Sequence, residues 1–427
     1  MDREHEYYQV FPLVVPADQM TTITIRSPYD HCRFEDAKEY EVAYYPKEYW
    51  PNEHPKKEFA VRAQGSSLII PYHFTGEQEH IFAVATQVNG TRKPIGTFSV
   101  YSLQRDLFER RPFKGDLHMH TYYSDGAESP AYVAASSRKI GLDFIAITDH
   151  HKYAPSLEAL EAYSSTVVDL QMFPGEEVHP PECHTHIVNF GGSFSINELF
   201  EDRNWYQHEI KRVIEELGPL PPGIEPHEYA SVFWCFEKVR EAQGLGIFCH
   251  PHWVTDNRYN IPQPFLEYVF EKQPFDAFEL LGGITPEDNN LQVAYYNEQR
   301  AHGKVIPIVG VSDAHGCHSR QNFGATYAMV FSPTLRLQDI ISSINELYSV
   351  AIEAIPGENP RVYGPFRLVK YARFLLREYI PLHDRLCFAE GNHMLDFIRG
   401  SKDAAAWLEA SQGQTKRLMD RLWAKGT

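Results

Sequence analysis

From residue 113 to about residue 355, short strand-like runs alternate with helical stretches, and nearly every run ends in histidine, aspartate or glutamate. Segments such as PAYVAASSRKIG and SLEALEAYSS, with apolar residues at helical spacing, separate these runs. The alternation predicts βαβ units and therefore a parallel sheet or barrel. Because the carboxyl ends of parallel barrel strands share one face, we expect the polar ends to meet there. The main runs are FKGDLHMH, LDFIAITDHH, QMFPGEEV, GLGIFCHPH, FDAFELLGG, KVIPIVGVSDAHG and ATYAMVFS.

Three regions are expected along the chain. Residues 1–108 contain β-branched runs separated by turn signals such as Asn89-Gly90, which predicts an antiparallel β-sandwich. Residues 109–355 form the α/β region, with an insertion at about 192–240. Residues 356–427 carry apolar residues at helical spacing and are expected to form a helical extension.

Smaller signals define individual elements of the α/β region. The pair Ser129-Pro130 predicts a helix start, and Gly141 predicts the end of that helix. The run LQDIISSINELYSVAIEA is read as the last barrel-associated helix.

Composition excludes several classes of protein. The chain has 427 residues, 43% of them hydrophobic, and a formal net charge of −17. That charge argues against a nucleic-acid partner or an anionic membrane surface. The six cysteines contain no C-x-x-C pair, and no run of 18 apolar residues occurs. We therefore expect a cytoplasmic protein without disulfides or a membrane anchor. No pattern in the sequence specifies an oligomeric state.

The polar strand ends carry residues suited to metal binding. In His118-Met119-His120 the two imidazoles project to the same side of an extended strand, so both can reach one ion. Taken alone, an H-x-H pair is more often a surface accident, and a single carboxylate is more often a helix cap. Several such groups buried together would be costly without cations. The joint pattern therefore predicts a metal centre.

At this point the sequence resembles the polymerase and histidinol phosphatase (PHP) superfamily of metal-dependent phosphoesterases. The matching words occur in family order: DLHMHTYYSDG, GLDFIAITDHH, PGEEV, HIVNF, IFCHP and GVSDAHG. The resemblance covers roughly residues 112–355 and implies a distorted (β/α)7 barrel. The phrase KGDLHMHTYYSDG after an N-terminal sandwich also resembles the carbaryl hydrolase-like branch.

The resemblance also implies a trinuclear site. Glu177 would bridge the first and third ions, with Glu176 as the rival candidate. Many family members carry histidine where this chain has Asp125, which leaves the metal at that position open. The mixed nitrogen and oxygen donors suit two to three divalent ions of zinc, manganese or iron. The implied ligands are His118, His120 and Asp313 for the first ion, Asp125, His150 and His315 for the second, and His186 and His250 for the third.

Residues near the motifs are candidates for substrate binding or proton transfer. Lys152, Arg258 and Arg320 could clamp a phosphate, although a solvated surface cation is the more common role for each such residue. His252 could act as a general acid or hold a ligand. Glu279 could support a ligand or form a salt bridge at the barrel rim. His151 could take the same roles as His252, and other neighbours of the motifs that could be structural are His179, His184, His302, His318, Cys249 and Cys317.

These observations predict a hydrolase that cleaves a small phosphomonoester or phosphodiester with a metal-activated hydroxide. The alternative is hydrolysis of a carboxylic or carbamate ester by the same metal cluster. A third hypothesis makes the α/β region a catalytically silent metal-binding scaffold.

Overall fold

A computed structural model describes residues 6–49, 57–282, 285–318 and 323–425. The chain divides into two compact units, each described by itself. The first unit comprises Met1–Arg111, Lys370–His383 and Gly413–Thr427, and the second comprises Pro112–Val369 and Asp384–Gln412. The proposed phosphate clamp Arg320 lies outside the described residues.

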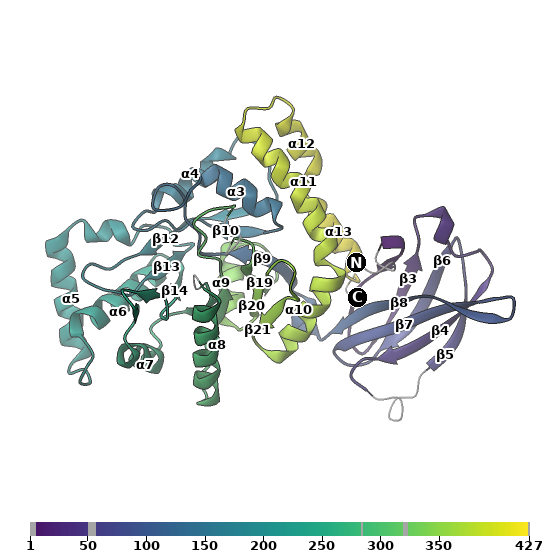
Figure 1. The fold of residues 1–427 in the computed structure, drawn as a ribbon, viewed down its shortest axis with the longest axis horizontal. Helices are drawn as coiled ribbons and strands as arrows, with labels where there is room; N and C mark the ends of the chain where they lie inside the picture. Colours follow the sequence, from purple (N-terminus) through teal and green to yellow (C-terminus); the bar gives the residue numbers. More distant parts are fainter. Residues whose placement is uncertain (1–5, 50–56, 283–284, 319–322, 426–427) are drawn as a thin grey trace. The chain divides into compact units, whose positions relative to one another are not determined.

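The first unit contains two β-sheets that enclose one apolar core (Figure 1). One sheet has the order β1-β3-β6 and the other β2-β8-β7-β4-β5, with antiparallel pairing except between β2 and β8. Asn89 and Gly90 have φ values of 50° and 77° and connect β7 to β8, as the hairpin signal predicted. The elements are β1 (Gln9–Phe11), β2 (Val14–Pro16), β3 (Gln19–Arg26), η1 (Asp30–Cys32), β4 (Glu39–Pro46), β5 (Lys57–Arg62), β6 (Ser67–Phe74), β7 (Gln78–Val88), β8 (Thr91–Leu103) and α2 (Arg105–Phe108).

A mixed six-stranded sheet lies in the second unit, in the order β11-β10-β9-β19-β20-β21. β10 pairs in parallel with β9 and β11, whereas β20 pairs antiparallel with β19 and β21. The run LQDIISSINELYSVAIEA was wrongly expected to be entirely helical. Its helix α9 (Leu337–Asn345) ends early, because the β-branched and small residues of Ser349–Glu353 form β20. The strands are β9 (Arg111–Asp116), β10 (Phe144–Ala146), β11 (Gln171–Phe173), β19 (Thr326–Ser332), β20 (Ser349–Glu353) and β21 (Arg361–Tyr363).

A second, five-stranded sheet has the order β12-β13-β14-β17-β18. Its last three strands are parallel, but β12, β13 and β14 are antiparallel, unlike the all-parallel expectation. The segment between β12 and β13 is too short for a parallel crossover, so the chain turns directly back. A further hairpin, β15 (Val254–Thr255) and β16 (Arg258–Tyr259), follows β14. The sheet strands are β12 (Gly175–Val178), β13 (Ile187–Phe190), β14 (Leu245–Phe248), β17 (Ala277–Leu281) and β18 (Ile308–Gly310).

Single backbone bridges connect the ends of the two sheets. Met119 pairs in parallel with Ala314, and His150 pairs in parallel with Glu177. The second unit is therefore a mixed α/β structure with a curled sheet, and the polar strand ends converge at these bridges. The seven-stranded barrel stays a prediction.

The helices of the second unit pack around the sheets, and their starts follow the sequence signals. Ser129 caps α3 by accepting a hydrogen bond from the Tyr132 amide, with Pro130 in the first turn as predicted. The expected insertion at 192–240 forms η2, α5 and α6, and α5, α6 and α7 lie to one side of β12 to β14 in Figure 1. The helices are α3 (Pro130–Lys139), α4 (Ala154–Ala162), η2 (Asn197–Phe200), α5 (Arg203–Leu217), α6 (Pro226–Glu241), α7 (Gln263–Lys272), α8 (Pro286–Ala301) and α9.

The aromatic residues of the expected insertion serve mainly in packing. Tyr206, Trp234 and Phe236 are buried in one core cluster with Phe248 of β14. The C-terminal helices are α10 (Phe366–Glu378), α11 (Ile380–Ile398), α12 (Ala404–Ser411) and α13 (Gln414–Leu422). Most of α10 and all of α13 belong to the first unit, whereas most of α11 and all of α12 belong to the second. Among the described residues, no helix has the length and apolar character needed to cross a membrane.

Candidate metal centre

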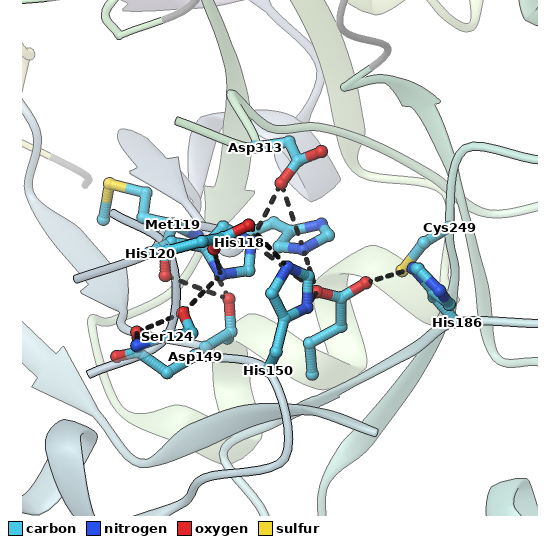
Figure 2. Close-up of polar contacts among 12 residues, drawn as sticks. His118, Met119, His120, Ser124, Asp149, His150, His186, Cys249 and Asp313 are labelled. Carbon is cyan, nitrogen blue, oxygen red and sulfur yellow. Dashed lines mark hydrogen bonds and ion pairs between the residues drawn. The ribbon is translucent and has the colours of Figure 1, made fainter. Parts of the chain in front are cut away.

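Nine predicted side chains come from strand ends that converge in the second unit. We call this set the carboxylate–histidine cluster. Figure 2 shows His118, His120, His150 and Asp313 of this set pointing toward one another. The full set is His118, His120, Asp125, His150, Glu177, His186, His250, Asp313 and His315.

The Glu177 carboxylate lies at the middle of the cluster and is completely buried. Its Oε2 atom faces three imidazole nitrogens: His118 Nε2 at 3.3 Å, His120 Nε2 at 3.6 Å and His150 Nδ1 at 2.5 Å. Its Oε1 atom faces three others: His179 Nε2 at 3.4 Å, His186 Nδ1 at 2.8 Å and His250 Nε2 at 3.4 Å. The Glu177 carboxylate therefore lies between two groups of histidines, and each of its oxygens contacts one group.

The first group is completed by Asp313. Its Oδ1 atom lies 2.9 Å from His120 Nε2 and 3.4 Å from His118 Nε2. Asp313 has a φ of 48°, a backbone conformation that non-glycine residues rarely adopt and that collects at functional sites. The fold thus maintains an unfavourable backbone geometry where this carboxylate meets the histidines.

Asp125 organises a second group at the edge of the cluster. Its Oδ2 atom lies 3.4 Å from His150 Nε2 and 3.3 Å from His315 Nε2, and its Oδ1 atom lies 3.9 Å from His120 Nδ1. The Asp125 side chain is 55% exposed, unlike the buried Glu177 and Asp313. This group is therefore the most accessible part of the cluster.

Several nitrogen and oxygen atoms of the cluster that could bind a metal ion lack hydrogen-bond partners among the described residues. Both oxygens of Glu177, Nε2 of His118 and Nδ1 of His186 are buried without such a partner. Although His186 and Glu177 come within 2.8 Å, they are not aligned for a hydrogen bond. Unpaired buried polar atoms are costly, and lone pairs that face a common space are what cations require of their ligands. The donor set therefore fits divalent metal ions.

Ionisation of the cluster reflects the same crowding. Burial lowers the pKa of His118, but the carboxylates of Asp313 and Glu177 outweigh it and raise this pKa well above its usual value. Burial raises the pKa of Glu177, but the charges of His186 and His118 hold it well below its usual range. For His250, burial is outweighed by Glu177 and Glu279, and the pKa rises to about 9. The buried carboxylates thus favour positive charge, which protons or metal ions can supply.

The outer nitrogens of two cluster histidines are held by oxygen atoms. His118 Nδ1 lies 2.8 Å from Oε2 of the buried Glu279, and His315 Nδ1 lies 2.8 Å from the Asp313 carbonyl oxygen. Such contacts fix the ring and leave the other nitrogen for a ligand role. Glu279 is therefore a support for His118, one of its two expected roles.

Asp149 holds the loop that follows His120. Its carboxylate accepts hydrogen bonds from the backbone amides and hydroxyls of Thr121 and Ser124, at 2.6 to 3.1 Å. Ser124 and Asp149 appear together in Figure 2. These bonds connect the end of β9 to the end of β10 and so position Asp125.

Glu176, the rival of Glu177, points away from the cluster. Its carboxylate accepts hydrogen bonds from Ser195 Oγ at 2.7 Å, Asn197 Nδ2 at 2.9 Å and Asn189 Nδ2 at 3.1 Å. Adjacent residues on a strand face opposite sides, so only one glutamate can reach the histidines. Glu176 instead anchors the segment that leads to η2.

The other predicted site residues lie in different surroundings. Lys152 is exposed and donates a hydrogen bond to the Tyr123 carbonyl oxygen. Arg258 is exposed on β16. The His252 ring contacts the rings of Tyr259 and Tyr295, and no contact with the cluster is present among the described residues.

His179 is the residue that the sequence reasoning did not assign to the cluster. Its Nε2 atom lies 2.9 Å from His150 Nδ1, and its ring stacks on that of His186 with centroids 3.8 Å apart. The available signal was the spacing of Glu177 and His179, since residues two apart on an extended segment project to the same side.

Comparisons with known proteins find a match over the segment that carries the first part of the cluster. Residues 116–205 match the PHP domain family, a segment that includes His118 and His186 but ends before His250. The DNA polymerase/3'-5' exonuclease PolX of Bacillus subtilis is 44% identical over 62 residues. That match covers 14% of this chain and only 11% of the length of the curated relative.

Solved structures show more distant likenesses. A two-domain Bacteroides vulgatus protein with a predicted PHP-like metal-dependent phosphoesterase is 15% identical, with a TM-score of 0.40, over 57% of this chain and 65% of that one. A candidate metal-dependent phosphoesterase from Bifidobacterium adolescentis is 22% identical, with a TM-score of 0.35, over 49% and 90%. The carbaryl hydrolase-like branch stays a prediction. The family match covers the first part of the cluster, and residues 116–205 of this chain are therefore similar to PHP domains.

Proposed function

We propose that this protein is a metal-dependent phosphoesterase that hydrolyses a small phosphomonoester or phosphodiester. The observation that carries the proposal is the buried Glu177 carboxylate, whose two oxygens each face three imidazole nitrogens without hydrogen-bond alignment. Such an arrangement suits a carboxylate shared between cations. The family match over residues 116–205 supports phosphate-ester chemistry.

In this proposal the cluster holds two to three divalent ions of zinc, manganese or iron. Glu177 lies between the first and third positions, and bound ions would supply positive charge to phosphate oxygens and acidify a water molecule. The ligands are His118, His120 and Asp313 for the first position, Asp125, His150 and His315 for the second, and His186 and His250 for the third.

The remaining residues of the site orient these ligands. Glu279 holds the His118 ring, and Asp149 holds the loop that carries Asp125. Because phosphoryl transfer depends mainly on positioning and charge stabilisation, such preorganisation accounts for much of the expected rate. The His252 ring contacts Tyr259 and Tyr295, and a general-acid role for this residue stays a prediction.

The test combines elemental analysis with two substrates. The purified protein is assayed with manganese or zinc on an aryl phosphate and on an aryl carboxyl ester. Two to three ions per chain with phosphate-ester turnover would support the proposal. Turnover of the carboxyl ester alone would favour the ester hydrolase instead, and bound metal without either activity would favour the scaffold.

Variants of the cluster make the test specific. His120→Ala and Asp313→Ala should abolish activity and lower the bound metal, while His208→Ala, at an exposed position on α5, should change neither. Full activity in either cluster variant would contradict the assigned site.

A further inference from the structure

His179 makes its polar contacts with the cluster through one nitrogen. Nε2 of His179 lies 2.9 Å from Nδ1 of His150 in hydrogen-bond geometry. The same atom lies 3.4 Å from Oε1 of Glu177. A ring nitrogen can accept one hydrogen bond or bind one ion, but it cannot do both with the same lone pair.

The two nitrogens of His150 face different surroundings. Its Nε2 atom lies 3.4 Å from Asp125 Oδ2, on the side of the second group, and His315 Nε2 lies 3.3 Å from the same oxygen. Its Nδ1 atom lies 2.9 Å from His179 Nε2 in hydrogen-bond geometry, whereas Glu177 Oε2, although only 2.5 Å away, is not aligned for a hydrogen bond. If Nε2 binds an ion, the neutral ring carries its proton on Nδ1, and this N–H needs an acceptor.

Two other cluster histidines show the same arrangement. Nδ1 of His118 lies against Glu279, and Nδ1 of His315 lies against the Asp313 carbonyl oxygen. In both rings the opposite Nε2 faces cluster carboxylates. His179 thus occupies at His150 the position that an oxygen acceptor occupies at these two rings.

The His179 ring is fixed before it meets His150. It stacks on His186 with centroids 3.8 Å apart and planes 20° apart, and it contacts His151 edge-on at 4.4 Å. The His179 backbone amide donates to Asn197 Oδ1 at 3.3 Å. An acceptor held this way orients its partner with little further loss of conformational entropy.

We propose that His179 is a positioning residue of the metal centre, whose Nε2 accepts the Nδ1–H of His150 and so directs His150 Nε2 toward the second cation. This inference rests on the proposed function. The rival assignment makes His179 itself a ligand beside Glu177 Oε1.

Three variants separate the two assignments. His179→Phe keeps a ring that can stack on His186 but removes the acceptor. His179→Gln places an amide oxygen at similar reach, which accepts a hydrogen bond but is a poor substitute for imidazole as a ligand of zinc. His184→Ala is the matched control, because the His184 side chain is 72% exposed on the same loop.

The experiment titrates the metal-free full-length protein with Zn²⁺ against a competing chelator and counts bound ions by elemental analysis. Thermal unfolding of the metal-free variants reports on the fold, and His179→Ala replaces His179→Phe if the latter does not fold. We expect His179→Phe to bind one ion about 10- to 100-fold more weakly. His179→Gln and His184→Ala should bind like the wild type.

Each other outcome overturns a distinct statement. Loss of one whole ion in both His179→Gln and His179→Phe would make His179 a ligand. Unchanged binding in His179→Phe would remove His179 from the metal centre. A wild-type protein that binds no ion would overturn the proposed function together with this inference.

Discussion

Nδ1 of His118 lies 2.8 Å from Oε2 of Glu279, and neither side chain has any exposed surface. The opposite nitrogen, Nε2, faces Glu177 and Asp313. Glu279 comes from β17, distant in sequence from His118. This pair connects a strand of the second sheet to the carboxylate–histidine cluster.

Glu279→Ala should weaken metal binding and activity about 10- to 100-fold, because the His118 ring loses its orienting partner. Glu279→Gln should retain more of both, since its amide oxygen still accepts the hydrogen bond. Metal titration and turnover measure the effect. Glu298→Ala, at an exposed position on α8, is the control, and equal behaviour of this control and Glu279→Ala would contradict the role.

Glu177→Gln and Glu176→Gln should have opposite consequences. Glu177→Gln removes the negative charge among the imidazoles, so bound metal and activity should be lost. Glu176→Gln replaces one acceptor oxygen by an amide group that donates and therefore faces other donors, which should cost about 1 to 3 kcal/mol of unfolding free energy while metal binding persists. Elemental analysis and chemical denaturation distinguish them, and loss of metal in Glu176→Gln alone would reverse the assignment.

Asp125→His should preserve the number of bound ions but change their preference. A carboxylate suits manganese, whereas imidazole suits zinc and iron. Because Asp125 is half exposed, the larger ring can be accommodated. Competition between Mn²⁺ and Zn²⁺ should therefore shift toward Zn²⁺ in the variant, and an unchanged ratio would show that Asp125 does not contact the ion.

Arg138→Ala should strongly destabilise the second unit. The guanidinium is completely buried and pairs with Glu390 at 2.7 Å and Asp143 at 3.1 Å. Removing it leaves two buried carboxylates without their cation, a cost of about 3 to 5 kcal/mol. Chemical denaturation measures this value. Arg212→Ala, which breaks an exposed pair on α5, should cost less than about 1 kcal/mol, and equal losses would contradict the argument.

Acid should destabilise the first unit through His80. Burial lowers the pKa of His80 from 6.5 to about 4, and the neutral ring contacts the hydroxyls of Tyr44 and Ser102 at 2.7 Å. Between pH 6.5 and about 4 the unfolded chain binds a proton that the folded chain does not. As the pH is lowered from 6.5 to about 4, the unfolding free energy should therefore decrease by roughly 3 kcal/mol at most, and it should level off at lower pH.

His80→Gln provides the comparison for this pH effect. The glutamine does not titrate, so the difference in unfolding free energy between wild type and variant should vary only between pH 6.5 and about 4. A difference that is independent of pH would show that His80 is not the responsible group.

Local patterns predicted the elements whose signals are short-range. Ser129-Pro130 begins α3, and Asn89-Gly90 turns β7 into β8, because capping and turn geometry depend on a few adjacent residues. The predicted end of α9 was wrong, because the pairing of β20 with β19 outweighs the helical spacing of apolar residues in that run. The antiparallel pairing of β12 with β13 was missed for the same reason: strand direction depends on partners elsewhere in the chain.

The sequence by itself determined which residue types gather at the strand ends, because the ordered motifs carry the histidines and carboxylates of the cluster. The tertiary structure alone decided which glutamate enters it, since Glu176 and Glu177 differ only in the side of β12 that they face. It also decided that Glu279 lies against His118 and that His179 lies against His150. These roles depend on distances of about a hydrogen bond between side chains on separate elements, and linear spacing does not encode them.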